Sequence, residues 1–192
     1  MNFKNFELPY VELPLQVPWY RIQRTRALPA SARVNGFILA PAGTLDGRFD
    51  LIDDVTAYLA DTEETALYET RFRRELMACS LSQLREYSAA CFKSERRLRL
   101  VDLRGMAEKF PGLQSPRHES TQALASECRN AALDGIIYSS AQHPQHVCIC
   151  LFRQGMPKMK KQSSNPLVEP STNELHPAVL RAAKGSLLPW VP

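Results

Sequence analysis

The stretch Val55-Thr56-Ala57-Tyr58-Leu59-Ala60-Asp61-Thr62-Glu63-Glu64 joins two kinds of local structure without a linker between them. Residues 55–60 are rich in β-branched, aromatic and apolar side chains, which favours a strand. Asp61 can cap a helix, and Glu64 can reach back toward it in the manner of a capping box. We therefore predict a strand that runs directly into a helix.

The predicted helix extends from about Thr62 to Cys79. Its inward stripe consists of residues that recur at helical spacing, namely Thr65, Tyr68, Phe72, Leu76 and Cys79. Glu69 borders this stripe, so it does not lie on the opposite, solvent-facing side. A carboxylate in this position either pairs with Arg73 one turn later, which would be a purely structural role, or is available for chemistry.

The remaining elements are predicted from apolar runs, alternation and turn residues. Strands are expected at residues 19–24, 97–103, 136–138 and 147–152. A helix should begin at Ser120 or Thr121 and end near Leu133, with Gly135 as its C-terminal stop. Residues 80–95 are polar and predict a helix–loop region. Because strands and helices alternate irregularly, we predict an α+β fold with a mixed β core and flanking helices.

Three segments are expected along the chain. Residues 1–18 contain three prolines and should form an extended N-terminal strap. Residues 19–152 should form the main domain, in which acidic and basic residues balance. Residues 153–192 carry the whole net charge of +4 and are rich in Lys, Pro, Ser and Asn. We expect a polar, basic tail that is mobile or bound by a partner, in which only residues 176–184 favour a short helix.

Composition excludes several classes of protein. A chain of 192 residues that is 44% hydrophobic and 23% charged fits a globular domain. No apolar run approaches the roughly 20 residues that a membrane helix needs, and residues 1–20 lack a secretory signal, so a cytoplasmic protein is expected. Five cysteines without a CxxC pair indicate reduced thiols and no metal site. The Walker, GxGxxG, HExxH and GxSxG motifs do not occur.

Five short motifs nevertheless occur in an order that resembles the RES domain family. They are Tyr20-Arg21-Ile22, Gly47-Arg48-Phe49-Asp50, Ala57-Tyr58-Leu59-Ala60, Thr65-Ala66-Leu67-Tyr68-Glu69, and Gly135-Ile136-Ile137-Tyr138-Ser139-Ser140 with Cys150-Leu151-Phe152. The resemblance spans about residues 19–152. The family usually has Gly-Arg-Trp-Asn where this chain has Gly-Arg-Phe-Asp. The polar residue that the family has before the last strand, often Asn, is either His146 or absent in this chain.

The family is named for its arginine, glutamate and serine. It includes bacterial toxins that degrade NAD by cleaving the nicotinamide–ribose bond, by phosphorolysis or hydrolysis, on a fold similar to that of ADP-ribosyltransferases. The resemblance therefore implies NAD as the substrate, inorganic phosphate as co-substrate if cleavage is phosphorolytic, and no resident cofactor. It also implies an inhibitory partner, typically a helix-turn-helix antitoxin protein. Direct nucleic-acid binding is not expected of a body with balanced charge.

The resemblance assigns roles that suit the chemistry of the side chains. Arg21 and Arg48 would hold the pyrophosphate, because a guanidinium presents paired donors to phosphate oxygens. Arg24 and Arg26 lie close enough in sequence to be confused with Arg21. Glu69 would stabilise the positive charge that develops on the ribose as nicotinamide leaves.

Two further residues complete the predicted site. Tyr58 would pack its ring on the nicotinamide or the ribose. Ser140 would hydrogen-bond the substrate or orient Glu69, although Ser139 is an alternative for the motif serine. The catalytic candidates are Glu69, Arg48, Tyr58 and Ser140, and the substrate-binding candidates are Arg21, Arg48, Tyr58 and Ser140.

Two other functions stay open at this point. The same fold could transfer ADP-ribose to a protein, which would label a macromolecule. Alternatively, the chain could be a non-catalytic module that binds nucleic acid or protein through its basic tail, in which case salt-sensitive DNA binding without NAD turnover is expected.

Overall fold

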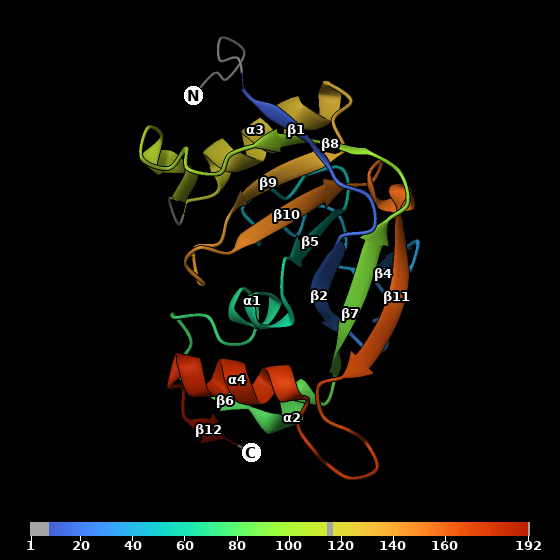
Figure 1. Cartoon of the computed structure of the whole chain (residues 1–192), viewed down its shortest axis with the longest axis vertical. Coiled ribbons are helices and arrows are strands. Elements are labelled where there is room, and N and C mark those ends of the chain that lie inside the picture. Colours follow the sequence, from blue (N-terminus) through green and yellow to red (C-terminus); the bar gives the residue numbers. More distant parts are fainter. Residues whose placement is uncertain (1–7, 115–116, 192) are drawn as a thin grey trace.

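The computed structural model describes residues 8–114 and 117–191 and is built around one eight-stranded sheet (Figure 1). The strand order is β1-β8-β9-β10-β5-β2-β7-β11, in which β8 and β9 are parallel and the other neighbours are antiparallel. The strands are β1 (Tyr10–Leu13), β2 (Pro18–Arg24), β5 (Thr56–Ala60), β7 (Tyr87–Ser94), β8 (Leu98–Asp102), β9 (Gly135–Ser139), β10 (Val147–Phe152) and β11 (Met159–Pro166).

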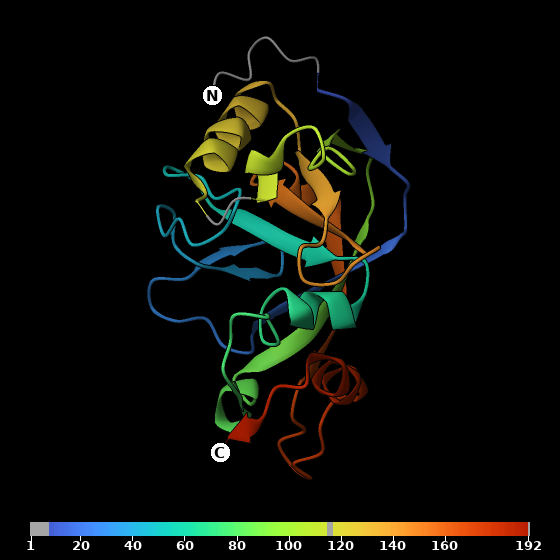
Figure 2. The same cartoon turned by 90° about the vertical axis from the view of Figure 1, so that its left-hand side faces the viewer.

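Helices and two small strand pairs flank this sheet (Figure 2). The α-helices are α1 (Glu63–Tyr68), α2 (Leu81–Leu84), α3 (Glu119–Asn130) and α4 (Pro177–Ser186), and the 3-10 helices are η2 (Pro111–Gln114) and η3 (Met156–Lys158). Strands β3 (Ala32–Val34) and β4 (Phe37–Leu39) form a hairpin, and β6 (Cys79–Ser80) pairs with β12 (Trp190–Val191). The expected α+β fold with a mixed sheet is confirmed. Within the described ranges, no helix is long and apolar enough to cross a membrane.

The sheet buries a separate apolar layer on each face, because side chains alternate along a strand. In β10, Cys148 and Cys150 belong to the layer that also contains buried residues of α1, α3 and α4. Ile149 and Leu151 belong to the other layer, together with the β3–β4 hairpin. Tyr58 packs against the first of these layers. The same alternation that builds the core therefore places the tyrosine of the third motif on the face that carries the helices.

The sheet is weakly joined between β5 and β2, whose register consists of the single pair Tyr20 and Ala60. Arg21 compensates for missing ladder bonds there, since its Nη1 donates to the Tyr58 carbonyl oxygen at 2.9 Å. Gln23 ties the same strand to the hairpin, because its amide side chain donates to the Gly36 carbonyl and accepts from the Ile38 amide. Polar side chains on β2 therefore link it to β5 and to the β3–β4 hairpin, where the sheet itself is weakly paired.

The predicted strand–helix unit forms, but its helix ends at Tyr68, so the prediction of a helix to Cys79 is wrong. The carbonyl oxygen of Leu67 accepts hydrogen bonds from the amides of Thr70, Arg71 and Phe72, which turns the chain away from the helix axis. This turn lets Phe72 reach the core, where it is 2% exposed. The periodicity that suggested a longer helix belongs to a segment of turns.

Two other local predictions are also wrong. Residues 80–95 form α2 and then the long strand β7, which lies between β2 and β11. Gly135 lies in β9 and does not terminate α3. A Cβ at this position would lie 2.2 Å from the Cys150 carbonyl oxygen, so the glycine allows β9 and β10 to approach each other.

The prediction of a mobile or partner-bound tail after residue 152 is wrong for the described residues. Strand β11 pairs with β7 in the main sheet, and α4 buries Ala178 and Val179 against the rest of the fold. The short helix itself is confirmed. At the other terminus, β1 pairs with β8, so residues before 18 also contribute to the sheet. Residues 1–7 of the predicted strap lie outside the described residues.

Candidate active site

Four of the five predicted site residues, namely Arg21, Arg48, Tyr58 and Glu69, line one cavity of about 690 Å³. This volume lies within the range of about 300–1,000 Å³ that is usual for small-molecule sites. Ser140 does not line the cavity, but its hydroxyl contacts Glu69, which does. The structure thus brings together residues from β2, β5, the C-terminal end of α1 and two loops, which lie far apart in the sequence.

Glu69 and Ser140 form the best-defined contact of the site. The Ser140 Oγ donates to Glu69 Oε1 at 2.5 Å. The same Oγ accepts hydrogen bonds from the amides of Gln142 at 3.3 Å and His143 at 2.9 Å, which leaves its own proton for Glu69. Ser139, the alternative serine, lines a second cavity of about 230 Å³. The geometry therefore pairs Ser140 with Glu69.

Glu69 owes its position to the short helix α1. Thr62 caps the helix, since its Oγ1 accepts from the Thr65 amide at 3.0 Å, and Glu69 is the C-terminal cap. The predicted cap at Asp61 is therefore wrong. The Asp61 carboxylate instead accepts from the Val147 amide and contacts His146 Nδ1, which ties the start of β10 to the start of α1.

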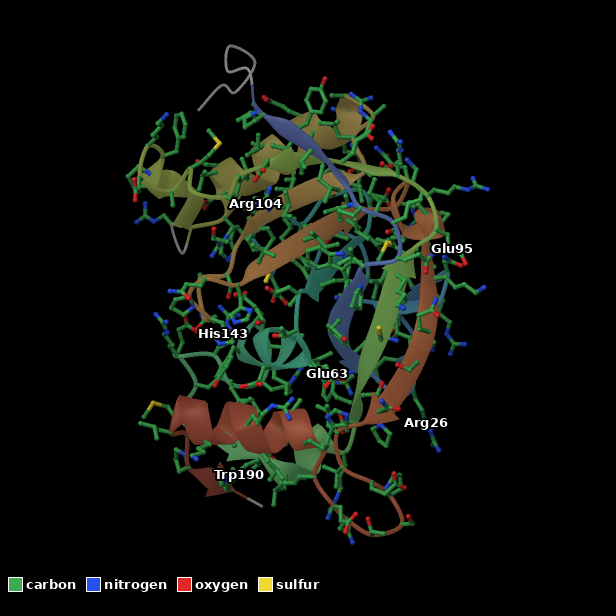
Figure 3. All side chains as sticks on the ribbon, in the orientation of Figure 1. Arg26, Glu63, Glu95, Arg104, His143 and Trp190 are labelled. Atoms are coloured by element: carbon green, nitrogen blue, oxygen red, sulfur yellow. The ribbon has the colours of Figure 1, made fainter. Side chains whose placement is uncertain are left out.

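Two histidines hold the loop between β9 and β10, since His143 contacts Thr65 of α1 and His146 contacts Asp61, which precedes this helix. Figure 3 labels His143 in this loop. The rings of His143 and His146 are stacked with their centroids 3.9 Å apart, and His143 Nδ1 lies 2.8 Å from Thr65 Oγ1. Burial and the neighbouring His146 lower the pKa of His143. These contacts hold in place the Gln142 and His143 amides, which donate to Ser140 Oγ. The two histidines therefore act on Glu69 only through Ser140.

Arg48 is presented by a tight turn of residues 47–50. The Tyr58 hydroxyl accepts from the Phe49 amide at 2.8 Å and donates to Asp50 Oδ1 at 2.9 Å, while Asp50 Oδ2 accepts from the Gly47 amide at 2.7 Å. A Cβ on Gly47 would lie 2.5 Å from the Tyr58 hydroxyl oxygen, so only glycine fits there.

The Arg48 guanidinium is available for an anion. Its Cζ lies 5.7 Å from the centroid of the Tyr138 ring. None of the described residues forms an ion pair or a hydrogen bond with it. A cation held by an aromatic ring and left without a carboxylate partner suits phosphate binding.

Tyr58 has its hydroxyl committed to the turn that carries Arg48. Burial, and then electrostatic interaction with Cys150 and Asp50, raise the pKa of Tyr58 well above its usual value, so the hydroxyl stays protonated. Thr56 donates to the same Asp50 oxygen at 2.7 Å. The ring of Tyr58 lines the cavity, and its packing on nicotinamide or ribose stays a prediction.

The Arg21 guanidinium stabilises the fold through hydrogen bonds to backbone carbonyl oxygens. Besides the bond to Tyr58, its Nη2 lies 3.4 Å from the Ile38 carbonyl oxygen. Burial lowers the pKa of Arg21 to about 10, which still leaves it cationic at neutral pH. Its Nε is buried without an acceptor among the described residues. Contact with the pyrophosphate stays a prediction for this residue.

Several cavity residues were missed by the sequence analysis, above all Arg71, Tyr87 and His118. Arg71 follows the C-terminal end of α1, so its position depends on where this helix ends. His118 caps α3, and burial together with the charge of Arg48 lowers its pKa. No short-range motif marked these residues. Arg24 also lines the cavity but is paired with Glu86.

The cysteines near the site are part of the core. Cys148 lines the cavity, and burial raises the pKa of both Cys148 and Cys150 well above the usual value. Their thiols are therefore protonated at neutral pH. In the part of the chain that the structure describes, no group of three or more His, Cys, Asp or Glu side chains could hold a metal ion.

The protein has an α+β fold. Its candidate site is a glutamate, hydrogen-bonded to a serine, at a cavity that is lined by arginines. The model of the RES domain matches residues 18–171, and the chain belongs to this family. The match extends beyond the resemblance seen in residues 19–152 and includes β11. No curated protein matches the chain.

A solved structure supports the fold. The chain is similar to a chain in the crystal structure of the M. tuberculosis MbcT–MbcA toxin–antitoxin complex, with a TM-score of 0.58 and 15% sequence identity. The similarity covers 78% of this chain and 84% of that chain. At this identity the likeness concerns the fold.

Proposed function

We propose that this protein degrades NAD by cleaving the bond between nicotinamide and ribose, by phosphorolysis or hydrolysis, as the toxin of a toxin–antitoxin pair. The observation that carries the proposal is the Glu69 carboxylate, fixed by Ser140 and facing a cavity of about 690 Å³ that also contains several arginines. Membership of the RES domain family supports it.

The chemistry follows from the charge that moves in the reaction. The bond from nicotinamide nitrogen to ribose C1 breaks, and its electron pair neutralises the pyridinium ring. Positive charge therefore develops on the ribose, and a carboxylate held beside it stabilises the transition state. An oxygen of phosphate or water then bonds to C1, and a water molecule used in this way releases a proton.

The protein would supply orientation as well as charge. Ser140 and the Gln142 amide, which lies 3.4 Å from Glu69 Oε1, hold the carboxylate in one position. Such preorganisation matters because small misplacements of a catalytic group cost much of the rate. Arg48 would bind the pyrophosphate, and Tyr58 would keep the Arg48 turn in place.

The test is nicotinamide release from NAD by the purified protein, with and without inorganic phosphate. Glu69→Gln should lower release by about a hundredfold or more, the scale for losing one electrostatic stabiliser. Glu64→Gln is the matched control, because Glu64 lies on the same helix but pairs with Arg181 of α4 at 2.8 Å. It should leave release unchanged.

The alternatives predict other outcomes of the same experiment. Dependence on phosphate would indicate phosphorolysis, and release without phosphate would indicate hydrolysis. Transfer of label from NAD to a protein would favour ADP-ribosylation. No reaction of NAD from folded protein would contradict the proposal, and salt-sensitive DNA binding would then favour a binding module.

The toxin role is tested in cells. Induced expression of the wild-type chain should lower cellular NAD and stop growth, whereas Glu69→Gln should do neither. The MbcT–MbcA likeness and the family suggest that a co-expressed antitoxin, which we expect to be a helix-turn-helix protein, restores growth. Growth arrest by the Glu69→Gln variant at equal expression would argue against NAD loss as the cause.

A further inference from the structure

Among the described residues, five arginines line the cavity, namely Arg21, Arg24, Arg48, Arg71 and Arg73. Arg24 is paired with Glu86, and Arg73 is paired with Glu75 at 3.3 Å. Arg21 donates to backbone carbonyl oxygens, as described above. Three of the five guanidiniums are therefore already engaged within the protein.

Arg71 is held in a different way. Its Cζ lies 3.8 Å from the centroid of the Tyr87 ring, a stacking distance. No described residue forms an ion pair with Arg71 or accepts a hydrogen bond from its side chain, and its Nε is buried. Buried donors are rarely left without acceptors, so this arrangement calls for an explanation. The ring fixes the position of the guanidinium, and no protein acceptor uses its donors.

Arg71 and Arg48 mark two separate places in one cavity. Arg48 lies over Tyr138 of β9, and Arg71 lies over Tyr87 of β7. In the order β9-β10-β5-β2-β7 the two tyrosines are four strands apart. Hydrogen-bonded strands lie about 4.8 Å apart, so these four steps, one of them across the weakly joined β5–β2 pair, amount to roughly 19 Å along the sheet. The two arginine–tyrosine pairs are therefore spread across the sheet, as contacts with the two halves of a dinucleotide would be.

The surroundings of Tyr87 suit a flat, uncharged group. Arg24 also lies near this ring, at 5.2 Å from its centroid. Leu28, in the loop after β2, lines the cavity and is 51% exposed, which offers apolar surface. Nucleic-acid bases stack on aromatic rings and on guanidinium planes irrespective of their hydrogen-bonding edges.

We propose that Arg71 and Tyr87 form the subsite for the adenine base, on the β7 side of the cavity, away from the Glu69 carboxylate, which contacts Ser140 just after β9. This inference rests on the proposed function, because it assigns the second half of the same dinucleotide. The reacting nicotinamide riboside would lie at Glu69, and the base would stack on the Arg71–Tyr87 pair. The subsite makes the enzyme selective for NAD over nicotinamide mononucleotide, which lacks the adenosine half.

Selectivity is the property to measure. We expect Arg71→Met to lower kcat/KM for NAD by about tenfold, the scale of one stacking contact, and to leave kcat/KM for nicotinamide mononucleotide unchanged. Arg71→Lys should behave similarly, since it keeps the charge but loses the planar group. Arg85→Met is the control, because Arg85 lies two residues before Tyr87 but does not line the cavity, and its guanidinium donates to Asn173 Oδ1 at 3.2 Å. It should change neither value.

Two outcomes of this experiment overturn the proposal. Equal losses with both nucleotides would place Arg71 at the reacting end or in folding, and unchanged values with both would exclude a role in binding. Thermal unfolding of Arg71→Met and Arg71→Lys separates a folding defect from a binding defect. The kinetic comparison uses the variant whose unfolding temperature equals that of the wild type.

A binding experiment keeps the subsite testable if the proposed reaction fails. Titration calorimetry with AMP requires no nicotinamide chemistry. Wild type and Arg85→Met should bind AMP, and Arg71→Met should bind it about tenfold more weakly. If the wild type releases no nicotinamide but this pattern holds, the subsite stands and the proposed reaction does not. If the wild type does not bind AMP, or Arg71→Met binds it equally well, the subsite is wrong.

Discussion

The two ends of the cavity are held together by different forces. At the Glu69 end, a carboxylate, a serine hydroxyl and two backbone amides form a network with distances of 2.5 to 3.4 Å. At the Arg71 end, a guanidinium rests on the Tyr87 ring and has no hydrogen-bond acceptor among the described residues.

The difference suits the two tasks that we assign to these ends. A group that stabilises a transition state must be oriented closely, and directional hydrogen bonds provide that orientation. A subsite that binds a base gains most of its energy from contact area, and stacking tolerates small displacements. Changes at the Glu69 end should therefore alter kcat, and changes at the Arg71 end should alter selectivity.

The largest effect is expected for Glu69→Gln. The amide keeps the size of the side chain but removes its charge, so kcat for nicotinamide release should fall by about a hundredfold or more. Affinity for AMP should stay at the wild-type value, because the adenine subsite lies at the other end. Steady-state kinetics and calorimetry on the same preparation measure both. A loss of AMP affinity in Glu69→Gln would contradict the assignment of separate roles to the two ends of the cavity.

A smaller effect is expected for Ser140→Ala. The hydroxyl orients Glu69, so its loss should lower kcat by about tenfold, the scale of one hydrogen bond to a charged group. In a Glu69→Gln background the same change should cost much less, because the two residues act as one unit. A double-mutant cycle on kcat measures this coupling. Additive losses would mean that Ser140 acts on the substrate independently of Glu69.

Tyr58→Phe tests the turn of residues 47–50, which presents Arg48 to the pyrophosphate that joins the two halves of NAD. The Phe49 amide would lose its acceptor, so the free energy of unfolding should fall by about 1–3 kcal/mol. KM for NAD should rise, because the turn that presents Arg48 is loosened, while kcat should change little. Urea denaturation and kinetics measure these values. Tyr20→Phe is the control, since no described residue hydrogen-bonds the Tyr20 hydroxyl.

The smallest effect concerns pH. The pKa of His143 is lowered by burial and by His146, against the opposing charges of Glu64 and Asp61. The folded state therefore disfavours the protonated ring, and stability that is present above pH 6.5, the unfolded value, is lost as pH falls below it.

This pH effect should be confined to one end of the cavity. Acidification below pH 6.5 should lower kcat through the loop that holds Ser140 and should leave AMP affinity nearly unchanged. His143→Gln should weaken the pH dependence of unfolding monitored by heat denaturation. An identical pH profile in this variant would show that His143 is not the responsible group.

Much of the candidate site was accessible from the sequence, because its residues lie in short motifs that keep their order. Arg48, Tyr58 and Glu69 do line one cavity, and Ser140 does contact Glu69. Arg71 and Tyr87 were not accessible. Arg71 reaches the Tyr87 ring only because α1 ends at Tyr68, and Tyr87 begins a strand whose sequence was too polar to recognise.

The sequence by itself determined the α+β class, the central strands and a short helix at residues 176–184, which is observed as Pro177–Ser186, because apolar patterning and turn residues act locally. Only the tertiary structure decided where α1 ends, how β11 joins the sheet, and which arginines stay unpaired. Strand β11 is mostly exposed and is held by backbone hydrogen bonds to β7, which side-chain composition does not report. Pairing between residues distant in sequence therefore completed both the sheet and the cavity.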